Sequence, residues 1–307
     1  MEARLQIFSG NSNGKLASEI VNNLGIPQGR AHVGTFEDGE TWIRLDENVR
    51  GSDVFLVQSL CTPTDHHIME LLLMVDAVKR SSASRITVVI PYMAYSKQEK
   101  KTHGREPISA KLLADIISKA GADRFLSVDL HSPAIEGFFD IPVDHLRASA
   151  MLAHHVEKMY LQDPVVVSPD TGGVDRANEM RERLGASLAI IYHERIEHDD
   201  CKTDECRRLE MVGDVNGRPA VIVDDMISTG ETVLMATEAL LEAGATEVYA
   251  CATHGVFTGN ALDLIEASPI KKVIVTNTVP VPPGAAGGKV QTLSVGSLIA
   301  ESIMSVR

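Results

Sequence analysis

The sequence predicts an α/β protein with two halves, each a mainly parallel sheet flanked by helices. Three observations support this fold class. Short runs rich in Val and Ile alternate along the whole chain with segments of helical periodicity. The runs are continuously apolar, as in strands that helices cover on both faces. The chain has 307 residues, of which 44% are hydrophobic, and this length favours two domains over one.

The expected elements follow in chain order. The first half contains the strand Val54–Val57, the helix Ile68–Lys79, the strand Ile86–Ile90, the helix Ala110–Ala120 and the strand Phe125–Val128. The second half contains the strand Val165–Val167, the helix Val174–Leu184, the strands Leu188–Ile191 and Ala220–Val223, the helix Thr232–Ala243, the strand Val248–Ala252, the helix Ala261–Ala267 and the strand Val273–Val275. Each strand is a short apolar run, and each helix repeats apolar residues three or four positions apart.

The domain boundary is expected near residues 145–150, which divides the chain into residues 1–147 and 148–307. Asp144 and His145 resemble a turn, and a helix is expected to start around Met151. In open α/β sheets, ligands bind at the carboxyl ends of the strands. Polar residues that directly follow the strands are therefore the candidate site residues.

Composition excludes several functional classes. The net charge of −13 argues against a nucleic-acid-binding protein, whose electrostatic footprint is basic. The four cysteines are too few and too scattered for a disulfide framework, which fits a reducing cytoplasm. The N-terminus lacks the apolar stretch of a secretory signal, and no run of about 18 apolar residues suggests a membrane span. We expect neither nucleic acid nor membrane as a partner.

The clearest functional motif is Val221–Thr232, in which a buried strand ends in Asp224 and Asp225 and a small polar loop opens a helix. Backbone N–H groups of such a loop, with the helix dipole, form an anion site. The hydroxyls of Ser228, Thr229 and Thr232 can donate to phosphate oxygens. The two acids can hold sugar hydroxyls or a hard cation. The alternative is an ordinary strand-to-helix turn with a polar cap.

Two further loops also follow strands. Ser168–Arg176 contains Asp170, placed as a metal or hydroxyl ligand, and the pair Gly172 and Gly173, which permits positive φ and close approach of the backbone to a ligand. In Ser127–His131, Asp129 and His131 alternate at a strand end, so both side chains are expected to point the same way. An ordinary turn and a structural histidine are the respective alternatives.

A basic loop and an acidic turn complete the set. Pro91–Lys101 follows a strand and carries Lys97, Lys100 and Lys101, which suit a clamp on a polyphosphate or form a solvated basic turn. Phe36–Glu40 combines an aromatic residue with three acids, and its residues alone indicate only a loop.

Taken together, these motifs make the chain similar to the ribose-phosphate pyrophosphokinase (phosphoribosyl pyrophosphate synthetase) family over essentially its full length. The resemblance rests on Phe8–Asn11, Phe36–Glu40, Val49–Gly51, Val54–Gln58, Met69–Leu72, Asp76–Arg80, Val128–His131, Gly137–Asp144, Val212–Val215, Thr253–Phe257 and Val275–Pro280. It implies two phosphoribosyltransferase-like domains, with the last helix, residues 297–306, packing back on the first. It also implies transfer of the diphosphoryl group of ATP to ribose 5-phosphate.

The resemblance implies a role for each candidate residue. The implied ATP-binding residues are Phe36, Asp38, Glu40, Lys97, Gln98 and His131, the first three on an adenine loop that reaches into a neighbouring subunit. The implied Mg²⁺ ligands are Asp129, His131 and Asp170, and the implied pyrophosphate loop is Asp170, Thr171, Gly172 and Gly173. The implied ribose 5-phosphate loop is Asp224, Asp225, Ser228, Thr229, Gly230, Glu231 and Thr232. A homo-oligomer of dimers assembled into a hexamer is implied as well.

The main departure from the family lies at the catalytic pair. Many members begin a catalytic loop after the strand that here ends near Tyr192 with Lys-x-Arg, whereas this chain has His193 and Arg195. A histidine of ordinary pKa is mostly neutral near pH 7, and loss of a transition-state cation is costly. The acidic segment Ile196–Arg208 is longer than expected, and its His198, Cys201 and Cys206 fit no zinc pattern well.

Smaller departures lie in the other loops. Ser228 replaces a common Asp, Glu231 stands where a small residue is usual, and Lys97, Glu99 and Lys100 replace Arg, Asp and Arg.

Three interpretations remain open: an active Mg²⁺-dependent synthetase, a weakly active or inactive regulatory paralogue that assembles with an active one, and a phosphoribosyltransferase with another acceptor. The intact adenine turn and acidic residues favour the first, and His193 favours the second.

Overall fold

The computed structural model describes residues 3–195, 207–282 and 287–306, with the side chains of residues 193–195 and 207–209 left aside. The chain forms two compact units. The first comprises Met1–Arg147, Asn277–Pro280 and Ser294–Arg307, and the second comprises Ala148–Thr276 and Val281–Leu293. In the part of the chain described, no helix is both long and apolar enough to cross a membrane.

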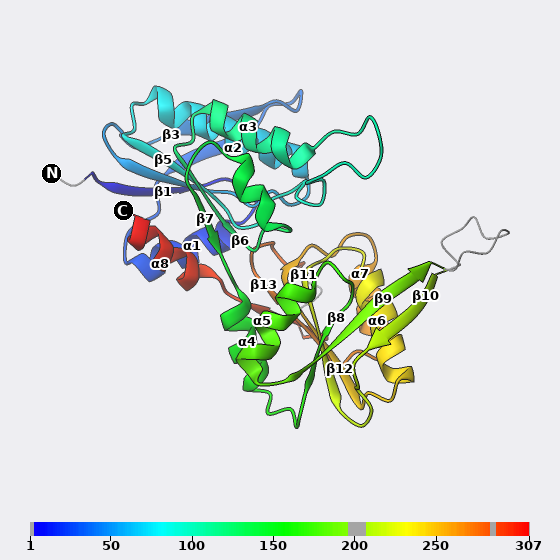
Figure 1. Cartoon of the computed structure of the whole chain (residues 1–307). Helices are drawn as coiled ribbons and strands as arrows, with labels where there is room; N and C mark the ends of the chain where they lie inside the picture. The colour runs from blue at the N-terminus through cyan, green and yellow to red at the C-terminus, as the bar shows by residue number, and fades with distance from the viewer. Residues whose placement is uncertain (1–2, 196–206, 283–286, 307) are drawn as a thin grey trace. The chain divides into compact units, whose positions relative to one another are not determined.

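The first unit is a five-stranded sheet in the order β1-β4-β5-β6-β7, with every neighbouring pair parallel. Its elements are β1 (Leu5–Ser9), α1 (Gly14–Leu24), β2 (Ala31–Thr35), β3 (Thr41–Leu45), β4 (Asp53–Val57), α2 (Thr64–Arg80), β5 (Arg85–Ile90), α3 (Ser109–Ala120), β6 (Arg124–Val128), the 3₁₀ helix η1 (Pro133–Phe138), β7 (Val143–Leu146) and α8 (Gly296–Val306). The β2–β3 hairpin forms a separate antiparallel pair. Helix α8 lies against α1 (Figure 1).

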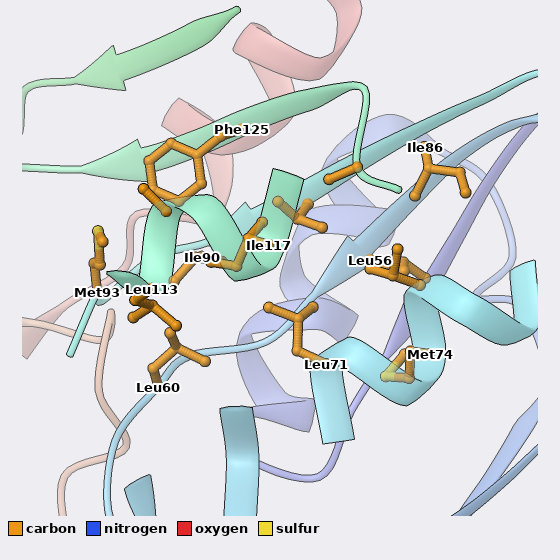
Figure 2. Packing of buried hydrophobic residues seen from close by; sticks show 14 of the residues in the cluster. Leu56, Leu60, Leu71, Met74, Ile86, Ile90, Met93, Leu113, Ile117 and Phe125 are labelled. Atoms are coloured by element: carbon orange, nitrogen blue, oxygen red, sulfur yellow. The ribbon is translucent and has the colours of Figure 1, made fainter. Parts of the chain in front are cut away.

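The core of the first unit explains why these strands are apolar on both faces. Apolar side chains of α2 and α3 pack on one face of the sheet, against residues of β4, β5 and β6. Figure 2 shows this layer, with Leu71 and Met74 of α2 and Leu113 and Ile117 of α3 facing the strands. Because α1 and α8 cover the opposite face, the strands have no solvated side, which confirms the prediction of mainly parallel, helix-covered sheets.

The second unit is a seven-stranded sheet in the order β10-β9-β8-β11-β12-β13-β14. Its elements are α4 (Ser149–Glu157), β8 (Val165–Ser168), α5 (Val174–Leu184), β9 (Ser187–Arg195), β10 (Arg207–Val212), β11 (Pro219–Ile227), α6 (Glu231–Glu242), β12 (Glu247–Gly255), α7 (Ala261–Ala267), β13 (Lys272–Thr276) and β14 (Val290–Leu293). Only the β9–β10 pair is antiparallel among the pairs described. This sheet too is α/β in class, as predicted.

One local prediction at the boundary is wrong. Asp144 and His145 do not form a turn; they lie in β7, the edge strand of the first sheet, and the following helix starts at Ser149 rather than around Met151. The charged and polar side chains of this strand have partners on other elements, which the sequence alone does not reveal. Arg124 Nη1 on β6 lies 2.8 Å from Asp144 Oδ2, so the carboxylate is compensated within the sheet.

Candidate active site

The acid pair of the ribose loop lies inside a strand. Asp224 and Asp225 belong to β11, which continues to Ile227 because Met226 and Ile227 pair with His254 and Gly255 of β12. The prediction that the strand ends at the acids is therefore wrong. Asp225 is buried, and its backbone N–H donates to Asp224 Oδ1 over 2.8 Å. Two adjacent carboxylates in a buried strand need a compensating cation.

Arg176 supplies that cation. This residue is in the first turns of α5, and its Nη1 lies 3.3 Å from Asp224 Oδ1 while its Nη2 lies 3.6 Å from Asp225 Oδ1. The sequence reasoning gave Arg176 no role, although it closes the Ser168–Arg176 motif. The available signal was electrostatic, because a buried Asp-Asp pair demands a nearby cation and this loop carried an arginine.

The pair carries less than two negative charges at neutral pH. Burial, reinforced by the neighbouring Asp225 carboxylate, raises the pKa of Asp224 to about 7, and the Arg176 guanidinium opposes that rise. Two close carboxylates share a proton because both cannot ionise cheaply in a desolvated site. The pair therefore titrates as a unit in the neutral range.

We expect Asp224→Asn to stabilise the free protein above pH 7. The folded pKa of Asp224 lies above its unfolded value, so the folded state binds more protons between about pH 4 and 7. The free energy of unfolding of the wild type must fall as pH rises through that window. Asparagine removes this dependence, and the variant should gain roughly 2–4 kcal/mol on the wild type from pH 5 to pH 8. Urea unfolding at both pH values measures it, and parallel pH curves would contradict the assignment.

The loop after β11 has the geometry of an anion site. Gly230 adopts φ +84°, a left-handed conformation that glycine reaches without strain, and α6 starts at the next residue, Glu231. Thr229, Glu231 and Thr232 are exposed around this helix N-terminus. Ser228 is fixed from a neighbouring loop, because its Oγ lies 3.2 Å from Thr258 Oγ1 and its carbonyl accepts from the Thr258 N–H. The helix N-terminus can therefore bind a phosphate.

The Ser168–Gly173 loop is tied to itself by Asp170. One carboxylate oxygen of Asp170 accepts from the Gly173 N–H over 2.8 Å, and the Asp170 carbonyl accepts from Ser168 Oγ over 2.7 Å. Neither Gly172 nor Gly173 has a positive φ, so that part of the prediction for the glycine pair is wrong, while close approach of the backbone to a ligand stays a prediction. Lack of space favours glycine at position 173, because a Cβ there would lie 3.0 Å from Ser168 Oγ.

Gly173→Ala should therefore disturb the loop without a backbone clash. The new methyl group would also lie 3.5 Å from both Asp170 Oδ1 and Arg176 Nη1, so it presses on the residues that order the loop. We expect catalytic efficiency to fall at least about tenfold while the melting temperature changes by only a few degrees. Gly172→Ala, which meets only Asp170 Oδ1 at 3.4 Å, is the control. Equal activity of the two variants would contradict this interpretation.

Asp129 and His131 lie just beyond β6, which ends at Val128. Asp129 adopts φ +42°, so strand alternation stops there, and the expectation that alternation aligns the two side chains is wrong. Asp129 is buried, and its Oδ1 lies 3.7 Å from Nη1 of Arg147. A non-glycine residue in the left-handed region is held by its surroundings, as is common at functional sites.

The basic loop and the acidic turn of the first unit are exposed. Lys97 and Gln98 are exposed, and Gln98 Oε1 accepts from Ser109 Oγ at the start of α3 over 2.6 Å. Phe36 is 56% exposed on the turn between β2 and β3, where Glu40 N–H donates to Asp38 Oδ1 over 3.1 Å. The turn thus presents an apolar ring and carboxylates to the outside.

The predicted catalytic residues lie in a strand rather than in a loop. β9 continues past Tyr192 to Arg195, and His193 and Arg195 pair with Leu209 and Arg207 of β10. The acidic segment with His198, Cys201, Lys202 and Cys206 falls outside the described residues. Within the described residues, no three or more His, Cys, Asp or Glu side chains gather into a metal-binding group. The described cysteines, Cys61 and Cys251, are free and buried.

Comparison with known proteins agrees with this geometry. Residues 5–121 match the N-terminal domain of ribose phosphate pyrophosphokinase, and residues 201–307 match the phosphoribosyl synthetase-associated domain. The ribose-phosphate pyrophosphokinase of Caldanaerobacter subterraneus subsp. tengcongensis is 48% identical over 98% of this chain and 94% of its own length. That of Corynebacterium ammoniagenes is 44% identical over 100% of this chain and 95% of its own length.

A solved structure gives the same result. The crystal structure of phosphoribosylpyrophosphate synthetase from Mycobacterium smegmatis aligns with a TM-score of 0.93 and 41% sequence identity, covering 99% of this chain and 98% of that one. Similarity of this degree over the full length, together with the acid pair and anion loop of the second unit, identifies the family. The chain belongs to the ribose-phosphate pyrophosphokinase family.

Proposed function

We propose that this chain transfers the diphosphoryl group of ATP to the 1-hydroxyl of ribose 5-phosphate, giving phosphoribosyl pyrophosphate and AMP. The observation that carries the proposal is the ribose loop of the second unit. It combines an acid pair with one half-buried member, Asp224, and one buried member, Asp225, with a left-handed Gly230 and a helix N-terminus, in a chain whose relatives bear the name of this activity. An acid pair beside an anion site suits a sugar phosphate, which carries hydroxyls and a phosphate on one molecule.

The second unit would bind ribose 5-phosphate. The 5-phosphate accepts hydrogen bonds from the backbone of Ser228, Thr229 and Gly230, from the loop hydroxyls and from the first turn of α6. Asp224 and Asp225 accept from the ribose hydroxyls, and Arg176 keeps them in place. The exposed Glu231 adds a like charge at the rim of this site. Asp170, Thr171, Gly172 and Gly173 would receive the transferred diphosphate.

The first unit would bind ATP. Lys97 and Gln98 contact the phosphates and adenine, and Asp129 and His131 lie on the phosphate side. The exposed turn Phe36–Glu40 is available to an adenine bound at a neighbouring subunit, since the Phe36 ring is not packed away. His193 and Arg195 are the catalytic pair, with Arg195 as the permanent cation near the transferred group.

Mg²⁺ is the proposed cofactor. Asp129, beside His131, would bind it on the first unit, and Asp170 would bind it on the second unit. The donor set fits the ion through its carboxylates, because Mg²⁺ in phosphoryl-transfer sites is bound by one or two carboxylates, water and substrate phosphates. This mode needs no group of three protein ligands. Imidazole is a poorer Mg²⁺ ligand, and His131 better suits a hydrogen bond to a phosphate oxygen. When bound, the ion neutralises charge on the ATP phosphates.

The reaction is an in-line displacement at the β-phosphorus. The 1-hydroxyl oxygen of the sugar forms a bond to that phosphorus, its proton is released, and the bond between the β-phosphorus and the α,β-bridging oxygen breaks, leaving AMP. The protein contributes position and charge. Asp224 and Asp225 orient the sugar, the loop at Asp170 receives the diphosphate, and Arg195 offsets the developing negative charge.

A homo-oligomer, with dimers assembled into a hexamer, is part of this proposal. Leu112 and Ile116 of α3 lie four residues apart, Ile108 directly before the helix continues the same spacing, and all three side chains are exposed, with Leu112 at 58%. Such an apolar stripe is typical of an interface. Leu112→Glu should therefore lower the mass found by sedimentation velocity by at least half, and an unchanged mass would contradict the role of α3.

The proposed location is the cytoplasm. The buried, free thiols of Cys61 and Cys251 fit a reducing compartment, where such cysteines stay unpaired.

Formation of AMP from ATP tests the proposed function. Purified protein is incubated with ATP and saturating Mg²⁺, with and without ribose 5-phosphate. We expect AMP release that depends on the sugar, and Asp225→Asn should lower the rate at least about a hundredfold. Ribose-independent release would indicate another hydrolytic activity. No release, with ATP still bound, would indicate a non-catalytic assembly partner of an active synthetase.

A further inference from the structure

Three consecutive residues, two at the end of the edge strand β7 and one directly after it, hold the segment Asp129–Leu130–His131. The Asp129 N–H donates to the Leu146 carbonyl over 2.9 Å, and the Leu130 N–H donates to His145 Nε2 over 2.7 Å. Arg147 Nη1 lies 3.7 Å from Asp129 Oδ1. Two of the contacts come from β7 itself and the third from the residue directly after it.

The hydrogen bond from the Leu130 N–H to His145 Nε2 requires one particular tautomer of the His145 ring. A backbone N–H can only donate, so His145 Nε2 must accept from Leu130 and cannot carry a proton. The proton of the neutral ring is then on Nδ1, which lies 2.5 Å from Glu136 Oε1 and donates to it. Glu136 on η1 thereby fixes both the tautomer and the ring orientation. Each ring nitrogen has one partner.

Both partners of this hydrogen bond are buried, so its loss would not be compensated by water. The His145 side chain is 4% exposed and Leu130 is 3% exposed. A Leu130 N–H that lost its acceptor would be left unsatisfied away from water, which is unfavourable. Desolvation also lowers the pKa of His145 below its ordinary value, which agrees with a neutral ring.

We propose that His145 is a positioning residue of the ATP side, which acts through Leu130 to hold Asp129 in its left-handed conformation and His131 beside it. A left-handed aspartate is stable only where its neighbours fix it, and here the fixed points are His145, Leu146 and Arg147. The Glu136–His145–Leu130 chain therefore sets where the Asp129 carboxylate points. The inference rests on the proposed function, since it assigns Asp129 and His131 to ATP.

The test compares His145→Phe with His145→Gln. Phenylalanine keeps a planar ring of similar size and removes the acceptor, whereas glutamine offers an oxygen to Leu130 and an amide N–H to Glu136. We expect His145→Phe to raise the KM for ATP about tenfold or more, because outer partners of a ligand-binding residue contribute about 10–100-fold. The KM for ribose 5-phosphate should stay within about twofold. His145→Gln should restore most of the ATP affinity.

Two further variants keep the result interpretable. Glu136→Ala changes a side chain that is 43% exposed, so it should fold normally and raise the KM for ATP about threefold or more. His154→Phe, at a 63% exposed histidine, is the control and should change neither KM. A lower melting temperature with an unchanged KM for ATP, in both His145→Phe and Glu136→Ala, would reduce His145 to a packing role and overturn the proposal.

Binding measured without turnover separates this proposal from the proposed function. Calorimetric titration of each variant with Mg-ATP reports the affinity even if the wild type releases no AMP. Weaker ATP binding by His145→Phe, with recovery in His145→Gln, supports the positioning role in either case. Equal ATP affinity of wild type, His145→Phe and Glu136→Ala overturns it, whatever the result for AMP formation.

Discussion

Arg176→Gln should be the most damaging single change on the ribose side. It leaves the half-buried Asp224 and the buried Asp225 without their cation, and breaking a buried ion pair from one side costs about 3–5 kcal/mol. The loss should be larger at pH 8 than at pH 5, because a proton on the acid pair removes part of the uncompensated charge. Urea unfolding at the two pH values measures both effects.

The kinetic consequence should fall on ribose 5-phosphate. We expect Arg176→Gln to raise its KM at least about tenfold and to leave the KM for ATP within about twofold, because the proposed role of the acid pair is to orient the sugar. Arg183→Gln is the matched control on the same helix; that arginine is 43% exposed and pairs with Glu179 at 3.0 Å. Equal stability and equal kinetics of the two variants would show that Arg176 does not hold the acid pair.

His193→Lys should raise turnover. The family commonly has lysine at this position, two residues before an arginine that this chain keeps as Arg195. If position 193 lies beside the transferred group, as proposed, a lysine there adds a permanent positive charge, and one such group is worth roughly 10²–10³-fold in rate. We therefore expect kcat to increase at least about tenfold with little change in either KM. Single-turnover AMP formation at pH 7 is the appropriate measurement.

A matched control makes the His193 result decisive. His154→Lys introduces the same change at an exposed histidine of α4 and should leave kcat unaltered. If kcat of His193→Lys equals that of the wild type, the missing lysine does not limit the reaction.

Much of the fold could be predicted because buried parallel strands leave a direct trace in the sequence. The runs at residues 86–90 and 125–128 are apolar on both faces, and β5 and β6 contain them entirely. The helices Val174–Leu184 and Ala261–Ala267 have the predicted bounds. Strand β7 was mistaken for a turn because it lies at a sheet edge, where Asp144 and His145 are tolerated only through Arg124, Glu136 and Leu130.

The residue types of the candidate site could be predicted from the sequence, but the contacts between these residues could not. Chemical type marked Asp224, Asp225 and Asp170, since acids next to buried apolar runs are conspicuous. The cation opposite the acid pair is Arg176, on another element, and no local pattern links the two. The same holds for the left-handed Asp129, whose conformation depends on residues 145–147. The positive φ expected at Gly173 does not occur, and the crowding there by Ser168 is a tertiary effect that no local pattern reveals.

Identification of the phosphorylated product is the most direct test of the central claim, which is that a diphosphoryl group moves as one unit onto the sugar. Phosphorus NMR of a completed reaction of ATP with ribose 5-phosphate distinguishes a diphosphate ester at carbon 1 from a monophosphate ester. We expect the diphosphate ester and AMP in equal amounts. ADP with a singly phosphorylated new position, or free pyrophosphate with unchanged ribose 5-phosphate, would contradict it.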